Sequence, residues 1–126
     1  MPGVERLAGI RVVAEPAALD AARFEGAVAV LRIAADEAYA VGASGVELDD
    51  ASAIVTVEAS LSGIWLAVRD AESWLERECS WELPTERPAF AQGMVAGIAT
   101  KLWLEHDRVL VVFPATMAAD AEERLA

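Results

Sequence analysis

The pattern of apolar and polar positions in the first half of the chain predicts short strands joined by tight turns. Residues 10–13 are expected to form a short strand, and Pro16 is expected to begin a helix that runs to about residue 23. The apolar run 27–34 and the segment 38–42 flank an acidic turn, which predicts a β-hairpin.

Residues 53–59 are rich in β-branched side chains and predict another strand. The turn-forming residues 60–63 follow, so residues 64–68 are expected to return as the second strand of a hairpin. Asp70 is the predicted N-cap of the next helix, because its carboxylate can accept free backbone N–H groups. Ala71, Trp74, Leu75 and Cys79 recur at helical spacing and predict its buried face.

The last part of the chain predicts a loop over 80–89, strands at 92–96, 98–105 and 108–113, and a closing helix over 115–125. The strand at 108–113 is apolar on both faces, which indicates a central position covered on both sides. From residue 53 the predicted order is β-β-α-β-β-β-α. Since consecutive strands are too close for helical crossovers, this order predicts an α+β fold with both helices on one face of a mostly antiparallel sheet.

Two tryptophans share predicted strand faces with basic residues. Alternation places Trp65 beside Arg69, and Trp103 beside Lys101. Tryptophan next to Arg or Lys on a half-polar surface is typical of protein–protein hot spots, so these four residues are the candidate partner interface. The alternative is that the tryptophans pack under the N-terminal segment or line the second side of the sheet.

Composition narrows the possible partners. The chain has 126 residues, 56% of them hydrophobic, and a formal net charge of −11. The length and apolar content predict one domain, over 26–126, preceded by a lead-in segment over 1–25. Such an acidic chain is expected to repel nucleic acids and anionic membranes. The charge serves either solubility or a basic partner surface.

Few residues offer catalytic or metal chemistry. The single histidine, His106, lies at a predicted turn, and the single cysteine, Cys79, lies on an apolar helix face, where it is expected to act as a small filler. One His and one Cys cannot build the familiar zinc clusters. The N-terminus lacks the features of a signal peptide and no apolar run is of membrane-spanning length, so a cytoplasmic location is expected.

Residues 28–125 resemble the gamma subunit of heterotetrameric sarcosine oxidase, which is similar to part of the glycine-cleavage aminomethyltransferase. The residues that carry this resemblance are the segments 31–37 (LRIAADE), 57–60 (VEAS), 68–71 (VRDA), 79–83 (CSWEL), 90–93 (FAQG), 97–103 (GIATKLW) and 108–114 (RVLVVFP).

The resemblance implies a ferredoxin-like α+β unit that assembles with larger subunits. In that family the larger subunits carry FAD, FMN, NAD and folate and oxidise an N-methyl amine such as sarcosine, while the gamma subunit holds no cofactor. It implies that this chain is a non-catalytic accessory subunit with no catalytic, cofactor-binding or metal-binding residues.

One departure from the related aminomethyltransferases concerns chemistry. Thr100 and Lys101 stand where those enzymes carry an acidic pair, and a threonine cannot act as a carboxylate in proton transfer. Two alternatives stay open: a stand-alone module that binds folate or a small amine, and a homo-oligomer in which the tryptophan-bearing sheet face pairs with itself.

Overall fold

The computed structural model of the chain describes residues 3–125, and they form two compact units. We call Leu7–Ala59 the N-terminal unit, and Ser60 onward together with the residues up to Arg6 the C-terminal unit. Strands β1 (Glu5–Val13) and β6 (Ile54–Ala67) each begin in one unit and end in the other. The fold class is α+β with a mostly antiparallel sheet, as predicted.

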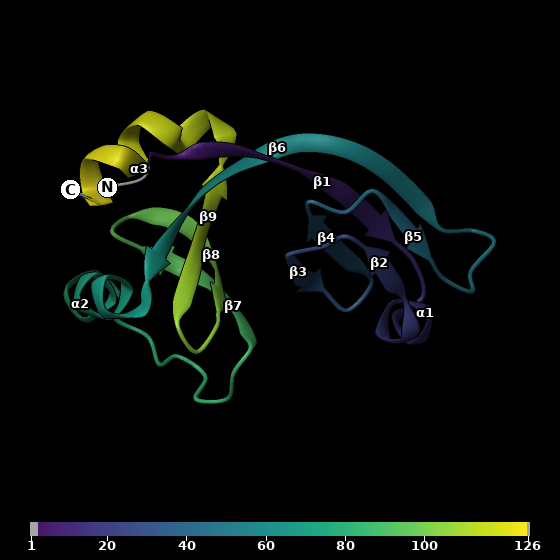
Figure 1. Cartoon of the computed structure of the whole chain (residues 1–126), viewed down its shortest axis with the longest axis horizontal. Coiled ribbons are helices and arrows are strands. Elements are labelled where there is room, and N and C mark those ends of the chain that lie inside the picture. The colour runs from purple at the N-terminus through teal and green to yellow at the C-terminus, as the bar shows by residue number, and fades with distance from the viewer. Residues whose placement is uncertain (1–2, 126) are drawn as a thin grey trace. The chain divides into compact units, whose positions relative to one another are not determined.

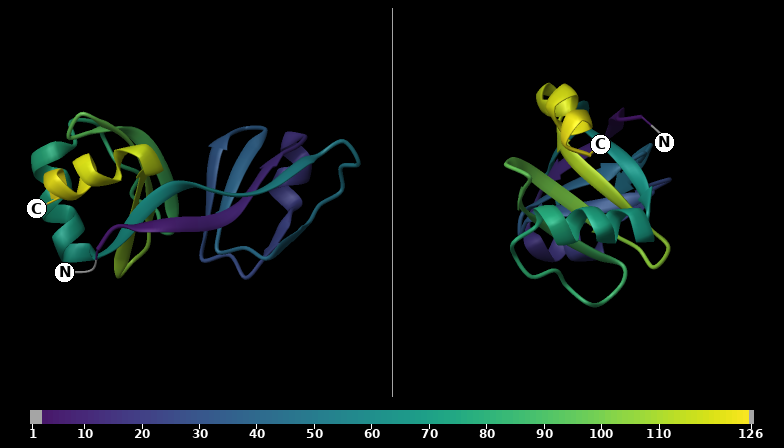
Figure 2. Two further views of the ribbon diagram at one scale, coloured as in Figure 1. Left: turned by 90° about the horizontal axis from the view of Figure 1, so that it is seen from above. Right: turned by 90° about the vertical axis from the view of Figure 1, so that its left-hand side faces the viewer.

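The C-terminal unit is a four-stranded antiparallel sheet with two helices. Its strands lie in the order β6-β9-β8-β7, and α2 and α3 lie on the same side of β7–β9 (Figures 1 and 2). After β6 the elements are α2 (Val68–Glu78), β7 (Ala89–Val95), β8 (Ile98–Leu104), β9 (Arg108–Pro114), the 3₁₀ turn η1 (Ala115–Met117) and α3 (Ala118–Leu125).

Both helices of this unit pack with the strands into a single apolar cluster. Trp74 of α2 and Ala121 of α3 are buried in it together with Val111 of β9. The next residues along β9, Leu110 and Val112, point to the opposite face and are also fully buried. The prediction that residues 108–113 form a central strand covered on both sides is therefore confirmed.

The N-terminal unit contains a second antiparallel arrangement, in which β4 lies between β3 and β1. The predicted hairpin of β3 and β4 is confirmed. Gly9 of β1 is required by this packing, because a Cβ at this position would lie 2.5 Å from the carbonyl oxygen of Ala40. The elements of the N-terminal unit are β1, α1 (Pro16–Ala21), β2 (Arg23–Glu25), β3 (Ala29–Ala34), β4 (Glu37–Val41), β5 (Gly45–Glu47) and the first residues of β6. Strand β2 pairs with β5.

A polar network built around Tyr39 lies inside the N-terminal unit. The Tyr39 hydroxyl oxygen is 2.7 Å from the carbonyl oxygen of Leu7 and 2.9 Å from that of Glu58. Arg11 donates to the carboxylates of Glu58 and Glu37, and its guanidinium carbon is 5.4 Å from the Tyr39 ring centroid. Burial, followed by the charge of Glu58, raises the pKa of Tyr39, so the phenol stays neutral.

Two predictions about residues 53–70 were wrong. Residues 60–63 do not turn, because β6 is one strand whose residues Leu61–Ala67 all pair with β9. The uninterrupted partner strand decides the outcome, and Ser62 is buried in the sheet opposite Phe113. In addition, α2 begins at Val68 with Ala67 as N-cap, so Asp70 lies in the first turn of the helix instead of capping it.

The predicted boundary between residues 25 and 26 stays a prediction about sequence organisation. The two compact units divide the chain at other positions, since the N-terminal unit runs from Leu7 to Ala59.

Candidate functional site

A groove in the C-terminal unit runs between α2 and the segment that connects it to β7. It encloses a cavity of about 260 Å³, somewhat smaller than the pockets that hold drug-sized ligands. The helix contributes Val68, Glu72, Leu75 and Glu76, which recur at spacings of three, four and seven residues and so lie along one stripe. Cys79, the C-cap residue of the helix, follows them. Leu104 and Val109 form its apolar floor.

The other wall of the groove is fixed by Trp81. Its indole nitrogen donates to the carbonyl oxygen of Met94 at 2.8 Å, and its ring lies against Gly93 of β7. A Cβ at Gly93 would come within 2.7–2.9 Å of the indole ring, so only glycine allows this contact. The Cys79 thiol is 3.4 Å from the Trp81 carbonyl oxygen, which joins this wall to the end of α2.

The charges around the groove are unequal. Two exposed carboxylates, Glu72 and Glu76, stand one helical turn apart on α2, and Arg87 is the cation among the lining residues. One Arg87 nitrogen already donates to the carbonyl oxygens of Pro84 and Glu86, both at 2.8 Å. An apolar floor with an acidic wall is suited to a small organic cation and disfavours a polyanion.

The candidate interface residues Trp65 and Trp103 lie on the sheet face of the C-terminal unit that points away from the helices. Trp65 and Trp103 are both register partners of Leu110, and Phe90 is the partner of Trp103. These four residues therefore form one cross-strand row, which we call the aromatic row. Both tryptophans are partly exposed. The prediction that they alternate with buried apolar residues on their strands is confirmed.

Each tryptophan of the aromatic row contacts a charged residue near the β8–β9 turn. The guanidinium carbon of Arg108 lies 3.7 Å from the centroid of the Trp65 ring, a close cation–π contact. The Trp103 indole nitrogen donates to Glu105, which also accepts from Arg108 at 2.8 Å. Burial acts to raise the pKa of Glu105, but the hydrogen bonds from Arg108 and Trp103 outweigh it and leave this pKa below its usual range.

The other two candidate interface residues occupy different places. Lys101 is on the same sheet face as the aromatic row, since it pairs with Val112 two residues along β9 from Leu110. Arg69 is exposed in the first turn of α2, because β6 ends at Ala67. The strand alternation that placed Arg69 beside Trp65 therefore does not apply to it.

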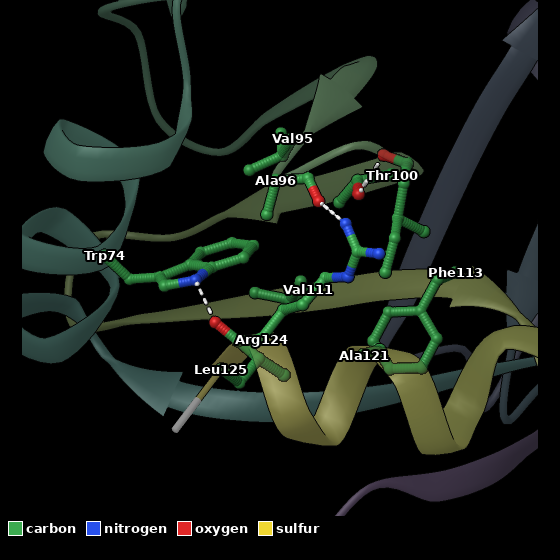
Figure 3. Close-up of a pocket in the computed structure, with 10 residues that line it drawn as sticks. Trp74, Val95, Ala96, Thr100, Val111, Phe113, Ala121, Arg124 and Leu125 are labelled. Carbon is green, nitrogen blue, oxygen red and sulfur yellow. Dashed lines mark hydrogen bonds between the residues drawn. The ribbon is translucent and has the colours of Figure 1, made fainter.

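A second, much smaller cavity lies between α3 and the sheet (Figure 3). Its volume of about 10 Å³ leaves room for no more than one water molecule. The Trp74 indole nitrogen donates to the carbonyl oxygen of Arg124 at 3.1 Å, and Arg124 in turn donates to the carbonyl oxygen of Ala96. These contacts attach α3 to α2 and to the β7–β8 turn, so this region is structural.

Thr100, which replaces an acidic residue in the resemblance, is buried beside this small cavity and donates its hydroxyl to the carbonyl oxygen of Ile98. Within residues 3–125, no group of three or more His, Cys, Asp or Glu side chains is arranged to hold a metal ion. No helix in the same range is long and apolar enough to cross a membrane.

Comparisons of the chain with models of protein families, with curated proteins and with solved structures find no match.

Proposed function

We propose that the chain is a non-catalytic accessory subunit of a larger cytoplasmic flavoenzyme of the sarcosine oxidase type, and that its C-terminal unit is a ferredoxin-like variant. The aromatic row carries the proposal, because tryptophan and arginine dominate the binding energy of protein interfaces. Its indole rings are partly exposed and are held in place by Arg108 and Glu105. FAD, FMN, NAD and folate belong to the partner subunits in this proposal.

The arrangement of α2 and α3 supports the ferredoxin-like part of the proposal. The buried residues of the two helices share one cluster, and within residues 3–125 no helix of that unit covers the face that holds the aromatic row. The order β-α-β-β-β-α lacks a helix between β8 and β9, since only three residues separate these strands. In this proposal, the unit is a variant of the ferredoxin-like order.

Affinity purification of the chain from its native cells tests the proposal. We expect flavin-bearing chains to co-purify and the complex to reduce its flavin when sarcosine is added, whereas the isolated chain binds no flavin. Trp103→Ala and Lys101→Glu should each weaken assembly at least about tenfold. Arg77→Glu is the matched control, because Arg77 is exposed on α2 away from the aromatic row. Unchanged assembly with both variants would remove this face from the proposal.

The groove beside α2 favours a second candidate function, a module that binds a small amine. The acidic wall formed by Glu72 and Glu76 attracts an ammonium group, and the apolar floor accepts an alkyl chain. Folate fits less well, since its own glutamate carboxylates would be repelled.

Titration of the isolated chain with n-butylamine and with folate, followed by tryptophan fluorescence, separates the candidates. Saturable binding of the amine that the double variant Glu72→Gln/Glu76→Gln weakens at least about tenfold would support the second function. Glu123→Gln is the control, because Glu123 is exposed on α3 outside the groove. The absence of any saturable signal with either ligand would exclude it.

A further inference from the structure

The first half of β6 presents an exposed apolar strand. In this segment, Ile54 is 63%, Val55 48% and Val57 82% exposed. The exposed residues alternate in direction along the strand, so apolar side chains are bare on both of its faces. Strand β6 lies between β1 and β9 in the sheet, and β9 pairs with it only from Leu61 to Ala67. On that side, the register within the described residues leaves Ile54–Val57 without a β9 partner.

Proteins usually protect such an edge from pairing with other chains. Charged side chains, prolines and bulges are the common means of protection. The segment from Ala51 to Val57 contains no charged residue and no proline, and its Ile-Val-Thr-Val sequence has high β-propensity. An unprotected strand of this kind in a chain that carries a net charge of −11 indicates a place where another strand pairs.

We propose that residues 53–57 pair with the same residues of a second copy of this chain, antiparallel across a two-fold axis. A two-fold interface requires a segment that is complementary to itself. A two-fold axis perpendicular to the sheet places a central residue opposite its own copy, so in the register centred on Val55 this residue lies opposite Val55 of the second copy and Ile54 lies opposite Thr56. Each pair combines two β-branched side chains, which pack well across strands.

Charge favours this antiparallel arrangement over a parallel one. The first carboxylate after the segment is Glu58, and in the antiparallel register it lies opposite Ser52 of the second copy. A parallel pairing in register would place Glu58 beside Glu58 of the second copy, and two like charges in adjacent strands repel each other. A guanidinium nitrogen of Arg11 also lies 2.7 Å from a carboxylate oxygen of Glu58, so the negative charge of Glu58 is compensated within its own chain. The pairing therefore avoids the like-charge contacts that an acidic chain would otherwise make.

Sedimentation velocity of the isolated full chain tests the proposal. We expect a concentration-dependent shift from the 13.4 kDa chain to a species of twice that mass. Added salt should strengthen the dimer, because it screens the repulsion between two acidic copies. Val57→Lys should raise the dissociation constant at least about tenfold, since it places a charge in the paired edge. Val28→Lys is the matched control, because Val28 is 49% exposed in the N-terminal unit but lies outside β6.

Circular dichroism confirms that each variant is folded, and Val55→Lys provides a second edge variant if Val57→Lys does not fold. A dimer with a micromolar dissociation constant is almost fully formed at a protein concentration of about 100 μM. A wild-type chain that stays monomeric at that concentration would overturn the proposal. A dimer that Val57→Lys and Val55→Lys leave intact would also overturn it. The outcome is independent of the accessory-subunit proposal, which depends on the aromatic row of the C-terminal unit.

Discussion

Strand β6 carries one isoleucine in each half, Ile64 and Ile54, and their surroundings are opposite. Ile64 is 4% exposed and belongs to the cluster that α2 and α3 cover, whereas Ile54 is 63% exposed. Both halves of the strand contain many apolar residues, and the first half is also rich in β-branched residues. The contrast shows that β6 performs two tasks: its second half builds a core, and its first half is available to another strand.

The largest expected effect separates the two halves directly. Ile64→Ala should lower the free energy of unfolding by about 2–5 kcal/mol, because it removes buried methyl groups and leaves a cavity. Ile54→Ala, the matched change in the same strand, should stay within about 0.5 kcal/mol when measured on dilute monomer. Urea unfolding of both variants provides the measurement. Equal losses would show that the first half is also part of a packed core.

A smaller effect is expected at Tyr39, which holds the end of the exposed half. Its hydroxyl lies within hydrogen-bond distance of the Glu58 carbonyl oxygen, where β6 passes from its exposed segment towards the covered one. Tyr39→Phe should cost about 1–2 kcal/mol, since it leaves partly buried carbonyl groups without this donor. Urea unfolding at neutral pH measures the loss. A neutral substitution would mean that these carbonyls are satisfied without the phenol.

The smallest effect is a pH dependence from the same residue. Because the pKa of Tyr39 is raised in the folded chain, the unfolded chain ionises first as pH rises above about 10. Stability is therefore fully present below that pH and decreases above it. Tyr39→Phe lacks this titration, so the stability gap between wild type and variant should shrink between about pH 8 and pH 11.

Unfolding at the two pH values measures that gap, and a gap that widens would contradict the assignment. Tyr39 is the single tyrosine of the chain, so its ionisation can be followed separately by absorbance.

Local patterns were sufficient for some elements and insufficient for β6. The β3–β4 hairpin and the central strand β9 follow from apolar runs and turn residues, and both were predicted. The turn expected at residues 60–63 was wrong because Ser-Leu-Ser-Gly favours a turn locally, whereas pairing with β9 holds it extended. That partner lies about 50 residues away in sequence, beyond the reach of a local pattern.

The groove was missed for a similar reason. The spacing of Glu72 and Glu76 on α2, followed by Cys79 at its C-cap, is visible in the sequence and could have indicated a surface with mixed chemistry. Its other wall depends on Trp81 lying against Gly93, a contact between distant residues that the sequence does not indicate. The strand face of Trp65 and Trp103 was found because alternation along single strands is a local property.

Amide hydrogen exchange along β6, at low and high protein concentration, tests the division of this strand most directly. We expect residues 61–67 to be protected equally at both concentrations, because β9 and the core cover them. The amides of residues 54–57 that point away from the neighbouring strand β1 should gain protection only at the higher concentration, when a second copy pairs with them. Protection of these amides that does not change with concentration would contradict the account.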